Sequence, residues 1–438
     1  MMMNPRSVLV ATLPLLFVVC RCGSVEAENW PAWRGPRGDG SSLEKHLPAR
    51  WNGPRNENIA WKAEIPGTGH ASPIIWDDRI FIVSCREASE DRLLLCLDRA
   101  NGHILWERVV LHSPLERKNP LNSCASSTPA SDGKLVYVTF LESDPKAPVN
   151  TSGAKYAGQL ASPGWMVVAA YDFAGNRRWM VRPGVFNSMH GFCSSPVLFE
   201  DLLIVNGDHD GDSYLVALKQ STGETVWKIP REHRIRSYCP PLIREIDGRT
   251  QMVLAGAGCV ASYDPHNGKR HWIIEGPTEQ YVASLVYNGK LFFMTAGYPT
   301  FHILAIRPDG QGDVTTTHVV WQTTKNCAYV PSPILAGGGR YLLVVADEGT
   351  ASCFEAQTGK RYWKERVGPH FSASPLEADG RVFFLSNRGV MTVIQAGAEF
   401  TLVAKNELGE DCYASPAISQ GRIFIRGESC LYCIGNRP

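Results

Sequence analysis

The sequence predicts an all-β protein, an eight-bladed β-propeller of four-stranded antiparallel blades whose ring is closed by an N-terminal strand. Two observations carry this prediction: short sequence elements recur eight times, and each end of the chain holds part of one blade. The composition agrees with it. The 438 residues include 40 glycines, 29 prolines and 12 tryptophans, which is typical of many short strands joined by turns.

The first repeated element is a Ser-Pro pair that is followed by a turn and a β-rich run. Ser72-Pro73, for example, precedes the turn Asp77-Asp78 and the apolar run 80–83. Seven further copies begin at Thr128-Pro129, Ser195-Pro196, Pro240-Pro241, Ser284-Leu285, Ser332-Pro333, Ser374-Pro375 and Ser415-Pro416. A repeat of roughly 40–50 residues with four strands is typical of a propeller blade. The copies therefore predict eight blades, whose strands we call A to D from the Ser-Pro pair onward.

The second repeated element is an acidic residue, a glycine and a tryptophan, separated by three residues each, as in Asp98, Gly102 and Trp106. The glycine suits a turn with positive φ, and the tryptophan falls on strand D, where its ring can pack against the next sheet. The predicted docking residues are Trp61, Trp106, Trp179, Trp227, Trp272, Trp321 and Trp363, with Phe400 in the seventh copy. The alternative, a stack of β-sandwiches, would not place one tryptophan at the same point of each repeat.

The ends of the chain predict how the ring closes. The eighth copy runs through strand C, residues 430–434, and then stops without a strand D. Residues 59–62 look like a strand D without a blade of their own, and pairing the two would remove the edges of an open sheet. We therefore expect the propeller over residues 59–438. Residues 28–58 should form an N-terminal extension that runs over the outside of the ring.

The first 27 residues predict a signal for export. Arg6 precedes an apolar stretch, residues 8–19, that is too short to span a membrane, and Ala27 ends a small-residue cleavage pattern. We expect cleavage after Ala27, with an uncleaved anchor as the alternative. The mature protein, residues 28–438, would then be periplasmic or extracellular and would have no transmembrane segment.

Charge and cysteine spacing exclude several classes of function. The chain has 44 basic and 43 acidic side chains, and removal of residues 1–27 would leave 42 of each. This balance favours neither nucleic acid nor an anionic membrane as a partner. Eleven of the 13 cysteines would remain, and their spacings form no metal-binding or haem-attachment motif. Which of them pair in an oxidising compartment is left open.

The two repeated elements resemble those of the pyrroloquinoline-quinone (PQQ) repeat family, whose propellers carry a similar tryptophan-docking motif. The resemblance covers about residues 59–434, and the opening segment 29–36, with Trp51 and Gly53-Pro54 after it, resembles that of secreted bacterial members. The layout is also similar to the outer-membrane-assembly propeller lipoprotein and to the quinoprotein alcohol dehydrogenases. The resemblance implies the fold and does not by itself imply an activity.

The residues just before each Ser-Pro pair are the candidate ligand-binding residues. With strand A innermost, the D–A connections and the B–C loops should emerge on one face, which we call the funnel face. Aromatic, imidazole and amide groups there suit a planar cofactor, a sugar or a peptide, although they could also merely line the funnel. The candidates are His70, Asn122, His190, Tyr238, Tyr281, Tyr329, His370 and Tyr413.

Two B–C loops carry further candidates. Asp208, Asp210 and Asp212 lie in a Gly-bounded loop, and their carboxylates are the oxygen ligands that Ca²⁺ prefers, so they form a candidate metal site. The alternative is an ordinary turn. The loop 141–165 is long and rich in Pro, Gly, Ser and Ala, so it should either fold over the funnel as a lid or be mobile.

Two classes of function remain after these exclusions. By the resemblance, a working quinoprotein dehydrogenase would carry two adjacent cysteines and a Ca²⁺ site with a catalytic aspartate, but the sequence has no Cys-Cys pair. No residue type repeats in a way that marks a catalytic group. We predict a monomeric, non-catalytic binding or scaffold protein that holds a protein, carbohydrate or small-molecule ligand on the funnel face. The alternative is a PQQ-dependent oxidoreductase that uses PQQ with Ca²⁺.

Overall fold

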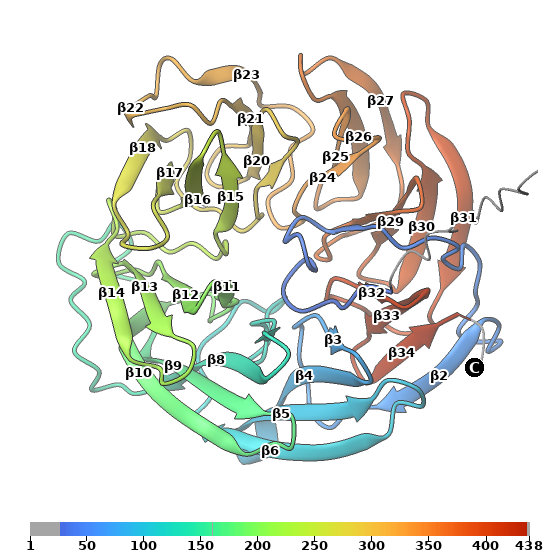
Figure 1. Ribbon diagram of the computed structural model, residues 1–438, viewed down its shortest axis with the longest axis horizontal. Helices are drawn as coiled ribbons and strands as arrows, with labels where there is room; N and C mark the ends of the chain where they lie inside the picture. The colour runs from blue at the N-terminus through green and yellow to red at the C-terminus, as the bar shows by residue number, and fades with distance from the viewer. Residues whose placement is uncertain (1–26, 160, 436–438) are drawn as a thin grey trace, which may run out of the picture.

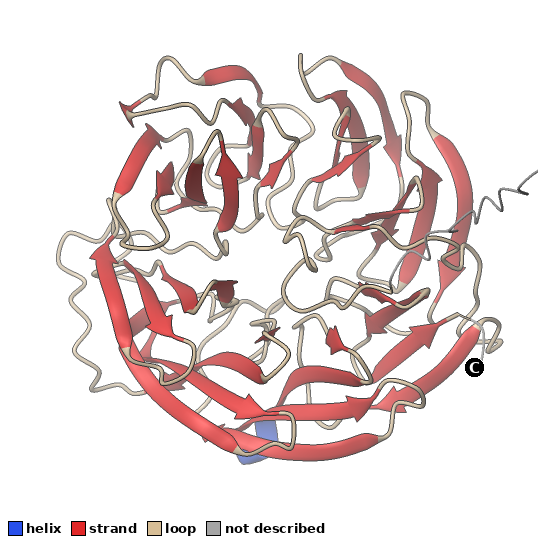
Figure 2. Ribbon diagram, in the orientation of Figure 1, coloured by secondary structure: helices blue, strands red, loops and turns tan. Residues whose placement is uncertain are grey.

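Eight four-stranded antiparallel sheets surround a central axis in the computed structural model, which describes residues 27–159 and 161–435 (Figure 1). Figure 2 shows strands and loops throughout, and the one helix of these residues is the 3₁₀ turn η1, Glu87–Ser89. The predicted all-β, eight-bladed propeller is therefore confirmed. None of the helical structure within the described ranges could reach across a membrane. The expected export signal, residues 1–27, lies outside the described residues except for Ala27.

Blades 1 to 4 follow one another along the chain, with strand A nearest the axis and strand D at the rim. Blade 1 consists of β3 (Ile74–Trp76), β4 (Arg79–Arg86), β5 (Asp91–Asp98) and β6 (Ile104–His112). Blade 2 consists of β7 (Ala130–Ser131), β8 (Leu135–Ser143), β9 (Ser162–Asp172) and β10 (Arg177–Ser188). Blade 3 consists of β11 (Val197–Phe199), β12 (Leu202–Gly207), β13 (Tyr214–Lys219) and β14 (Thr225–Pro230). Blade 4 consists of β15 (Leu242–Ile246), β16 (Arg249–Gly256), β17 (Cys259–Tyr263) and β18 (Arg270–Glu275).

Blades 5 to 8 continue the ring in the same order. Blade 5 consists of β19 (Val286–Tyr287), β20 (Phe292–Ala296), β21 (His302–Ile306) and β23 (Val319–Thr323). Blade 6 consists of β24 (Ile334–Ala336), β25 (Tyr341–Val345), β26 (Thr350–Glu355) and β27 (Arg361–Arg366). Blade 7 consists of β28 (Leu376–Ala378), β29 (Arg381–Leu385), β30 (Val390–Gln395) and β31 (Thr401–Glu407). Blade 8 consists of β32 (Ala417–Ser419), β33 (Arg422–Arg426), β34 (Cys430–Ile434) and β2 (Ile59–Glu64). Short parallel strands add to two sheets: β22 (Gly312–Asp313) to blade 4 and β1 (Ser41–Ser42) to blade 7.

The N-terminal strand β2 closes the ring. It pairs antiparallel with β34, so that Trp61 lies opposite Cys433 and Glu64 opposite Cys430. Strand β2 thus supplies the strand D that the eighth repeat lacks. Because every sheet is packed between two neighbours, the middle strands are buried on both faces; all six residues of β12, for example, are buried. The rim strands, such as β14, alternate between exposed and half-buried positions.

The tryptophans of strand D tie each blade to the next one. Trp61 of β2 donates its Nε1–H to the carbonyl of Arg99, in the C–D turn of blade 1, over 3.0 Å. Five others bond in the same way: Trp106 to Phe173, Trp179 to Gln220, Trp227 to Pro265, Trp321 to Ala356 and Trp363 to Gly397. Trp272 differs, because it is fully buried and donates to the Gln251 side chain of its own blade.

The glycine of the same motif is required by the tryptophan that docks on it. Gly102 has a φ of +78°, and a Cβ at this position would lie 2.6 Å from the Trp61 ring. Gly223 meets the Trp179 ring at the same distance and also has a positive φ. Both the backbone conformation and the lack of space therefore select glycine, which explains why glycine and tryptophan recur together.

The serine of the Ser-Pro element links the blades near the axis. Its hydroxyl accepts the backbone N–H of the corresponding residue in the preceding blade, over 2.8–3.1 Å. These bonds run from Ser72 to Thr128, Thr128 to Ser195, Ser284 to Ser332, Ser332 to Ser374 and Ser374 to Ser415. Blade 4 carries Pro240 in this place and has no hydroxyl to offer.

The first half of the N-terminal extension does not take the expected course over the outside of the ring. Trp30 exchanges backbone hydrogen bonds with Ile75 of β3 and is fully buried. Trp33 donates to the Ser284 hydroxyl over 2.9 Å, and Arg34 donates to the carbonyl of Pro333 over 2.8 Å. Residues 30–42 therefore cross the middle of the ring, where Figure 1 shows them in dark blue. We call this segment the plug, because eight blades leave an axial space that its tryptophans fill.

Residues 43–58 then leave the axis on the face opposite the funnel and reach the rim. The Glu44 carboxylate accepts the backbone N–H of Gln420 in the A–B turn of blade 8, and Trp51 is buried beside Asn406 of β31. Asn52 bridges to Glu407, the last residue of β31. The extension thus connects the axis to strand β2.

Candidate functional site

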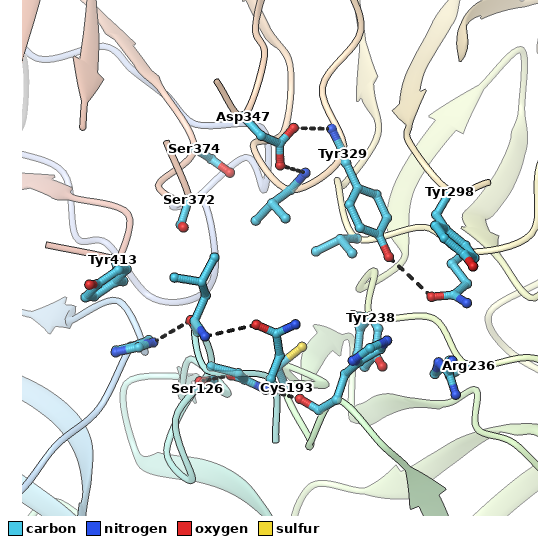
Figure 3. Close-up of a pocket in the computed structure, with 18 of the residues that line it drawn as sticks. Ser126, Cys193, Arg236, Tyr238, Tyr298, Tyr329, Asp347, Ser372, Ser374 and Tyr413 are labelled. Atoms are coloured by element: carbon cyan, nitrogen blue, oxygen red, sulfur yellow. Dashed lines mark hydrogen bonds between the residues drawn. The ribbon is translucent and has the colours of Figure 1, made fainter. Parts of the chain in front are cut away.

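A cavity of about 630 Å³ opens on the funnel face, above the plug. The residues that precede or begin strand A line it in all eight blades, and six of the predicted ligand-binding residues are among them: His70, Asn122, His190, Tyr238, Tyr329 and Tyr413. Figure 3 shows these connections converging from around the ring. The lining also includes residues outside those eight candidates, namely Trp33, Gln159, Cys193, Arg236, Gln280, Tyr298, Asp347 and Ser372.

Two of the predicted residues lie elsewhere. Tyr281 is fully buried in the core and donates its hydroxyl to the carbonyl of Gly276 over 2.6 Å. Its neighbours Gln280 and Val282 line the cavity instead, since successive side chains of an extended segment point in opposite directions. His370 is exposed and does not line the cavity, to which Ser372 contributes in its place.

The His70 and Tyr413 rings form one wall of the cavity. They stack with their centroids 4.5 Å apart and an interplanar angle of 27°. His70 Nδ1 lies 3.1 Å from the carbonyl of Leu121 and so carries the proton, which leaves Nε2 as an acceptor. Burial, with smaller contributions from the charges of Lys118 and Arg426, lowers the pKa of His70 to about 4, although the hydrogen bond to Leu121 raises it. The imidazole is therefore neutral near pH 7.

His190 on the adjoining wall is neutral for the same reason. Burial, together with the charge of Arg236, lowers its pKa to about 4. No hydrogen bond joins its ring to any residue in the described ranges, so its acceptor nitrogen is available to a ligand. Its backbone carbonyl accepts from Asn122, which fixes the connection that leads into blade 3.

Asp347 is the carboxylate of the cavity lining, and the backbone already uses both of its oxygens. They accept the N–H groups of Tyr329 over 2.7 Å and of Val330 over 3.1 Å. Burial raises the pKa of Asp347, whereas these bonds act in the opposite direction. The Tyr329 hydroxyl in turn donates to Gln280 over 3.3 Å (Figure 3). Asp347 thus holds in place the backbone of Tyr329 and Val330, both of which line the cavity.

The long B–C loop of blade 2 borders the cavity. Tyr156 donates its hydroxyl to Glu279, in the connection into blade 5, over 2.6 Å, and the Arg236 guanidinium lies 4.4 Å from the Tyr156 ring centroid. Gln159 accepts a hydrogen bond from Arg236 over 2.8 Å and lines the cavity. The described part of the loop therefore has the position of a lid; its residue 160 lies outside the described residues.

The loop with Asp208, Asp210 and Asp212 does not form the candidate metal site. Asp208 is fully buried and pairs with Arg231 over 2.9 Å, while Asp210 pairs with Arg236 over 2.5 Å. Asp212 pairs with Arg234 over 2.6 Å. Each carboxylate thus has an arginine as its partner instead of a shared cation. Within residues 27–159 and 161–435, no group of three or more His, Cys, Asp or Glu side chains is placed to hold a metal ion.

The cavity does not fit PQQ with Ca²⁺, the cofactor pair that the resemblance brought into question. PQQ carries three carboxylates, which need cations or a metal ion as partners. The cation in the lining is Arg236, and Asp210 and Gln159 already occupy its guanidinium. Asp347 adds a carboxylate on the opposite wall (Figure 3).

A family model described as outer membrane protein assembly factor BamB matches residues 54–155, 162–298 and 310–399. No curated protein matches the chain. Among solved structures, BamB from Moraxella catarrhalis aligns with a TM-score of 0.57 at 12% identity, over 85% of this chain and 98% of that one. A europium-containing methanol dehydrogenase aligns with a TM-score of 0.60 at 11% identity, over 92% and 90% of the two chains. The computationally designed Ika8 protein aligns with a TM-score of 0.57 at 11% identity, over 86% and 100%.

These structural likenesses show the fold alone, because the identities are low. A BamB and a methanol dehydrogenase share it, which is consistent with one propeller that serves different functions. The family match is more specific, since it extends over most of the propeller. The chain therefore belongs to the PQQ-repeat propeller family of the outer membrane protein assembly factor BamB.

Proposed function

We propose that this chain is an exported, non-catalytic binding protein that holds one small ligand in the funnel cavity. The observation that carries the proposal is the cavity itself, which has a volume of about 630 Å³ and receives lining residues from all eight blades. A concave, mostly pre-formed site with a few convergent polar groups is the usual form of a small-molecule site. The plug closes the channel beneath it, which gives the cavity a floor.

The state of the reactive side chains supports a binding role over a catalytic one. His70 and His190 are neutral with pKa values of about 4, so neither is poised to exchange a proton near pH 7. Burial raises the pKa of Cys193 to about 12, which keeps its thiol protonated. Asp347 is occupied by two backbone N–H groups. The lining thus offers no activated base or nucleophile.

Export and a monomeric state belong to the same proposal. The N-terminal sequence supports export through its apolar stretch and small-residue cleavage pattern. The description of the matching family as an outer membrane assembly factor also favours a periplasmic or extracellular location. The ring supports a monomer, because β2 closes it without a second chain.

A ligand search with a blocked variant tests the proposal. We expect at least one compound from a panel of sugars, nucleosides, amino acids, organic acids and quinones to raise the melting temperature of the mature protein. The variant Val282→Trp, which fills the cavity, should lose that rise. The control Val320→Trp, on the exposed face of rim strand β23, should keep it.

Two outcomes would contradict the proposal. One is a panel in which no compound raises the melting temperature, or in which the Val282→Trp variant responds like the wild type. The other is calorimetric binding of PQQ with Ca²⁺ together with dye-linked alcohol oxidation. That second result would establish the alternative function, a PQQ-dependent oxidoreductase.

A further inference from the structure

The hydrogen-bonding groups of the cavity suit a ligand with many hydroxyls. Ser195, Ser374 and Ser415 line the cavity and are almost fully buried, and each hydroxyl oxygen accepts a backbone N–H from the preceding blade. The Ser372 hydroxyl oxygen instead accepts a side-chain N–H of Asn387, in the same blade, over 3.1 Å. Within the described ranges, none of these hydroxyls donates its own proton to another residue. Four O–H donors therefore remain for a ligand on the floor and one wall of the cavity.

Donors and acceptors on the other walls are also unused. The side-chain N–H groups of Asn119 and Gln159 have no acceptor within residues 27–159 and 161–435, although both residues line the cavity. His70 and His190 each offer an acceptor nitrogen while they are neutral. A hydroxyl group can both donate and accept, so a polyhydroxyl ligand can satisfy both kinds of group at once.

The cavity also presents flat apolar surfaces beside these polar groups. Trp33 lies at its floor, Tyr413 stacks on His70, and Tyr298 lines it with 46% of its surface exposed. Aromatic rings of this kind combine an apolar face with a polar edge. A pyranose has matching properties, because its C–H groups form a flat face and its hydroxyls project around the edge.

The charges of the cavity favour an uncharged ligand. Arg236 and Asp347 are the charged residues of the lining, and both are already bonded, Arg236 to Asp210 and Asp347 to two backbone N–H groups. A charged ligand would lose its hydration without gaining a partner of opposite charge. A purely apolar ligand would instead leave the buried serine hydroxyls without partners, which is also costly.

We propose that the funnel cavity binds an uncharged saccharide, such as a neutral monosaccharide or the end of a neutral glycan. This inference rests on the proposed function, since it names the ligand class of the same site. Gln159 places one of the donors on the lid, so the lid loop of blade 2 contributes to the recognition of the sugar directly.

Isothermal titration of the mature protein tests the inference. The probes are glucose, galactose, mannose, N-acetylglucosamine, maltose and cellobiose, with glucuronate and glucosamine as charged analogues of the same ring. At least one neutral sugar should bind, and its charged analogue should bind at least tenfold more weakly. Deoxy analogues of the bound sugar should also bind more weakly, because a lost hydroxyl leaves site groups unpaired.

Matched variants separate the cavity from the rest of the surface. Gln159→Leu should weaken binding of the sugar about three- to tenfold, as expected for one hydrogen bond. Gln322→Leu, the same change on the exposed face of β23, should leave binding unchanged, and Val282→Trp should abolish it. Equal effects of Gln159→Leu and Gln322→Leu would overturn the inference.

The remaining outcomes distinguish the two proposals. Should no neutral sugar bind, while a charged or apolar compound does bind and is lost in Val282→Trp, the saccharide inference fails and the proposed function stands. Should no compound of any class bind, or should binding persist unchanged in Val282→Trp, both fail.

Discussion

The rim and the funnel of this propeller are built from the same repeats but use them in opposite ways. At the rim, six tryptophans of strand D or its equivalent make the same bond to the next blade. At the funnel, the side chains before strand A differ from blade to blade: His, Asn, His, Tyr, Gln, Tyr, Ser and Tyr line one cavity. The rim therefore repeats a structural contact, whereas the funnel combines unlike groups around one space.

This difference indicates which residues hold the ring and which are left for a ligand. A substitution at the rim or in the closing strand should reduce stability without changing binding. A substitution on the funnel wall should do the reverse. The following changes test this division, from the largest expected effect to the smallest.

Deletion of residues 28–62 should have the largest effect. It removes the plug and the first four of the six residues of β2, so the outer edge of β34 in blade 8 becomes exposed and the ring opens. We expect the truncated protein to lose cooperative thermal unfolding, measured by circular dichroism. A shorter deletion, residues 28–57, keeps β2 and should retain a cooperative transition at a lower temperature. A 28–62 deletion that melts at the full-length temperature would contradict the role of β2.

Substitution of a docking tryptophan should reduce stability less than this deletion does. The loss should be larger where the tryptophan is more deeply buried. Trp272 is fully buried, so Trp272→Ala should lower the free energy of unfolding by about 3–5 kcal/mol. Trp106 is only partly buried, so Trp106→Ala should lower the free energy of unfolding by about 1–3 kcal/mol. Urea unfolding at pH 7 measures both. Equal losses for the two variants would show that burial does not set the cost.

Acid should weaken the junction of blades 2 and 3 through His209, whose ring packs against Phe186 of β10 and Tyr214 of β13. This side chain is fully buried. Burial, with smaller contributions from the charges of Lys228 and Arg234, lowers its pKa to about 4, although Asp212 raises it. Between pH 6.5 and pH 4 the unfolded chain therefore binds more protons than the folded protein. The contribution of the neutral His209 to the free energy of unfolding is complete above pH 6.5 and is lost as the pH falls towards 4. The loss should approach about 3 kcal/mol.

Urea unfolding at pH 7 and pH 4.5 checks the His209 effect. His209→Gln should show a smaller loss of stability at pH 4.5 than the wild type, because it removes the group that takes up the proton. His103→Gln, at an exposed position, should follow the wild type. A His209→Gln variant with the pH dependence of the wild type would rule out this residue as the cause.

The glycine of the docking motif allows a narrower test of the rim. Gly102→Ala and Gly289→Ala both place a Cβ at a positive φ, but only the first Cβ meets a tryptophan ring, at 2.6 Å. Gly102→Ala should therefore lower the free energy of unfolding by about 1–3 kcal/mol more than Gly289→Ala does. Differential scanning calorimetry of the two variants measures the difference. A difference near zero would mean that the Trp61 ring moves aside freely.

The sequence predicted the rim well because each of its contacts is repeated. Most copies carry a glycine four residues before the tryptophan. Each repeat therefore shows both the glycine that receives the tryptophan of the preceding blade and the tryptophan that docks on the next blade. The closing strand was equally visible, since Ile59–Glu64 fits the one position that the eighth repeat leaves open. A contact between neighbouring blades can therefore be predicted from the sequence when the residues on both of its sides recur in every repeat.

The funnel was predicted only in part because its contacts are not repeated. Tyr281 and His370 precede strand A like the others, but the direction of a side chain in an irregular connection depends on its neighbours. Lid residue Gln159 and plug residue Trp33 come from segments without any repeat. The arginines that pair with Asp208 and Asp210 lie more than 20 residues away, so the loop alone looked like a metal site.

One comparison of two variants tests the division between rim and funnel most directly. Trp227→Phe removes the bond from strand β14 to the carbonyl of Pro265, and Val282→Trp fills the cavity. The measurement is the melting temperature of each variant with and without the strongest ligand of the panel. We predict that Trp227→Phe melts at a lower temperature but keeps the full ligand-induced rise, whereas Val282→Trp keeps its melting temperature and loses the rise. A ligand-induced rise that is lost in Trp227→Phe and kept in Val282→Trp would contradict the account.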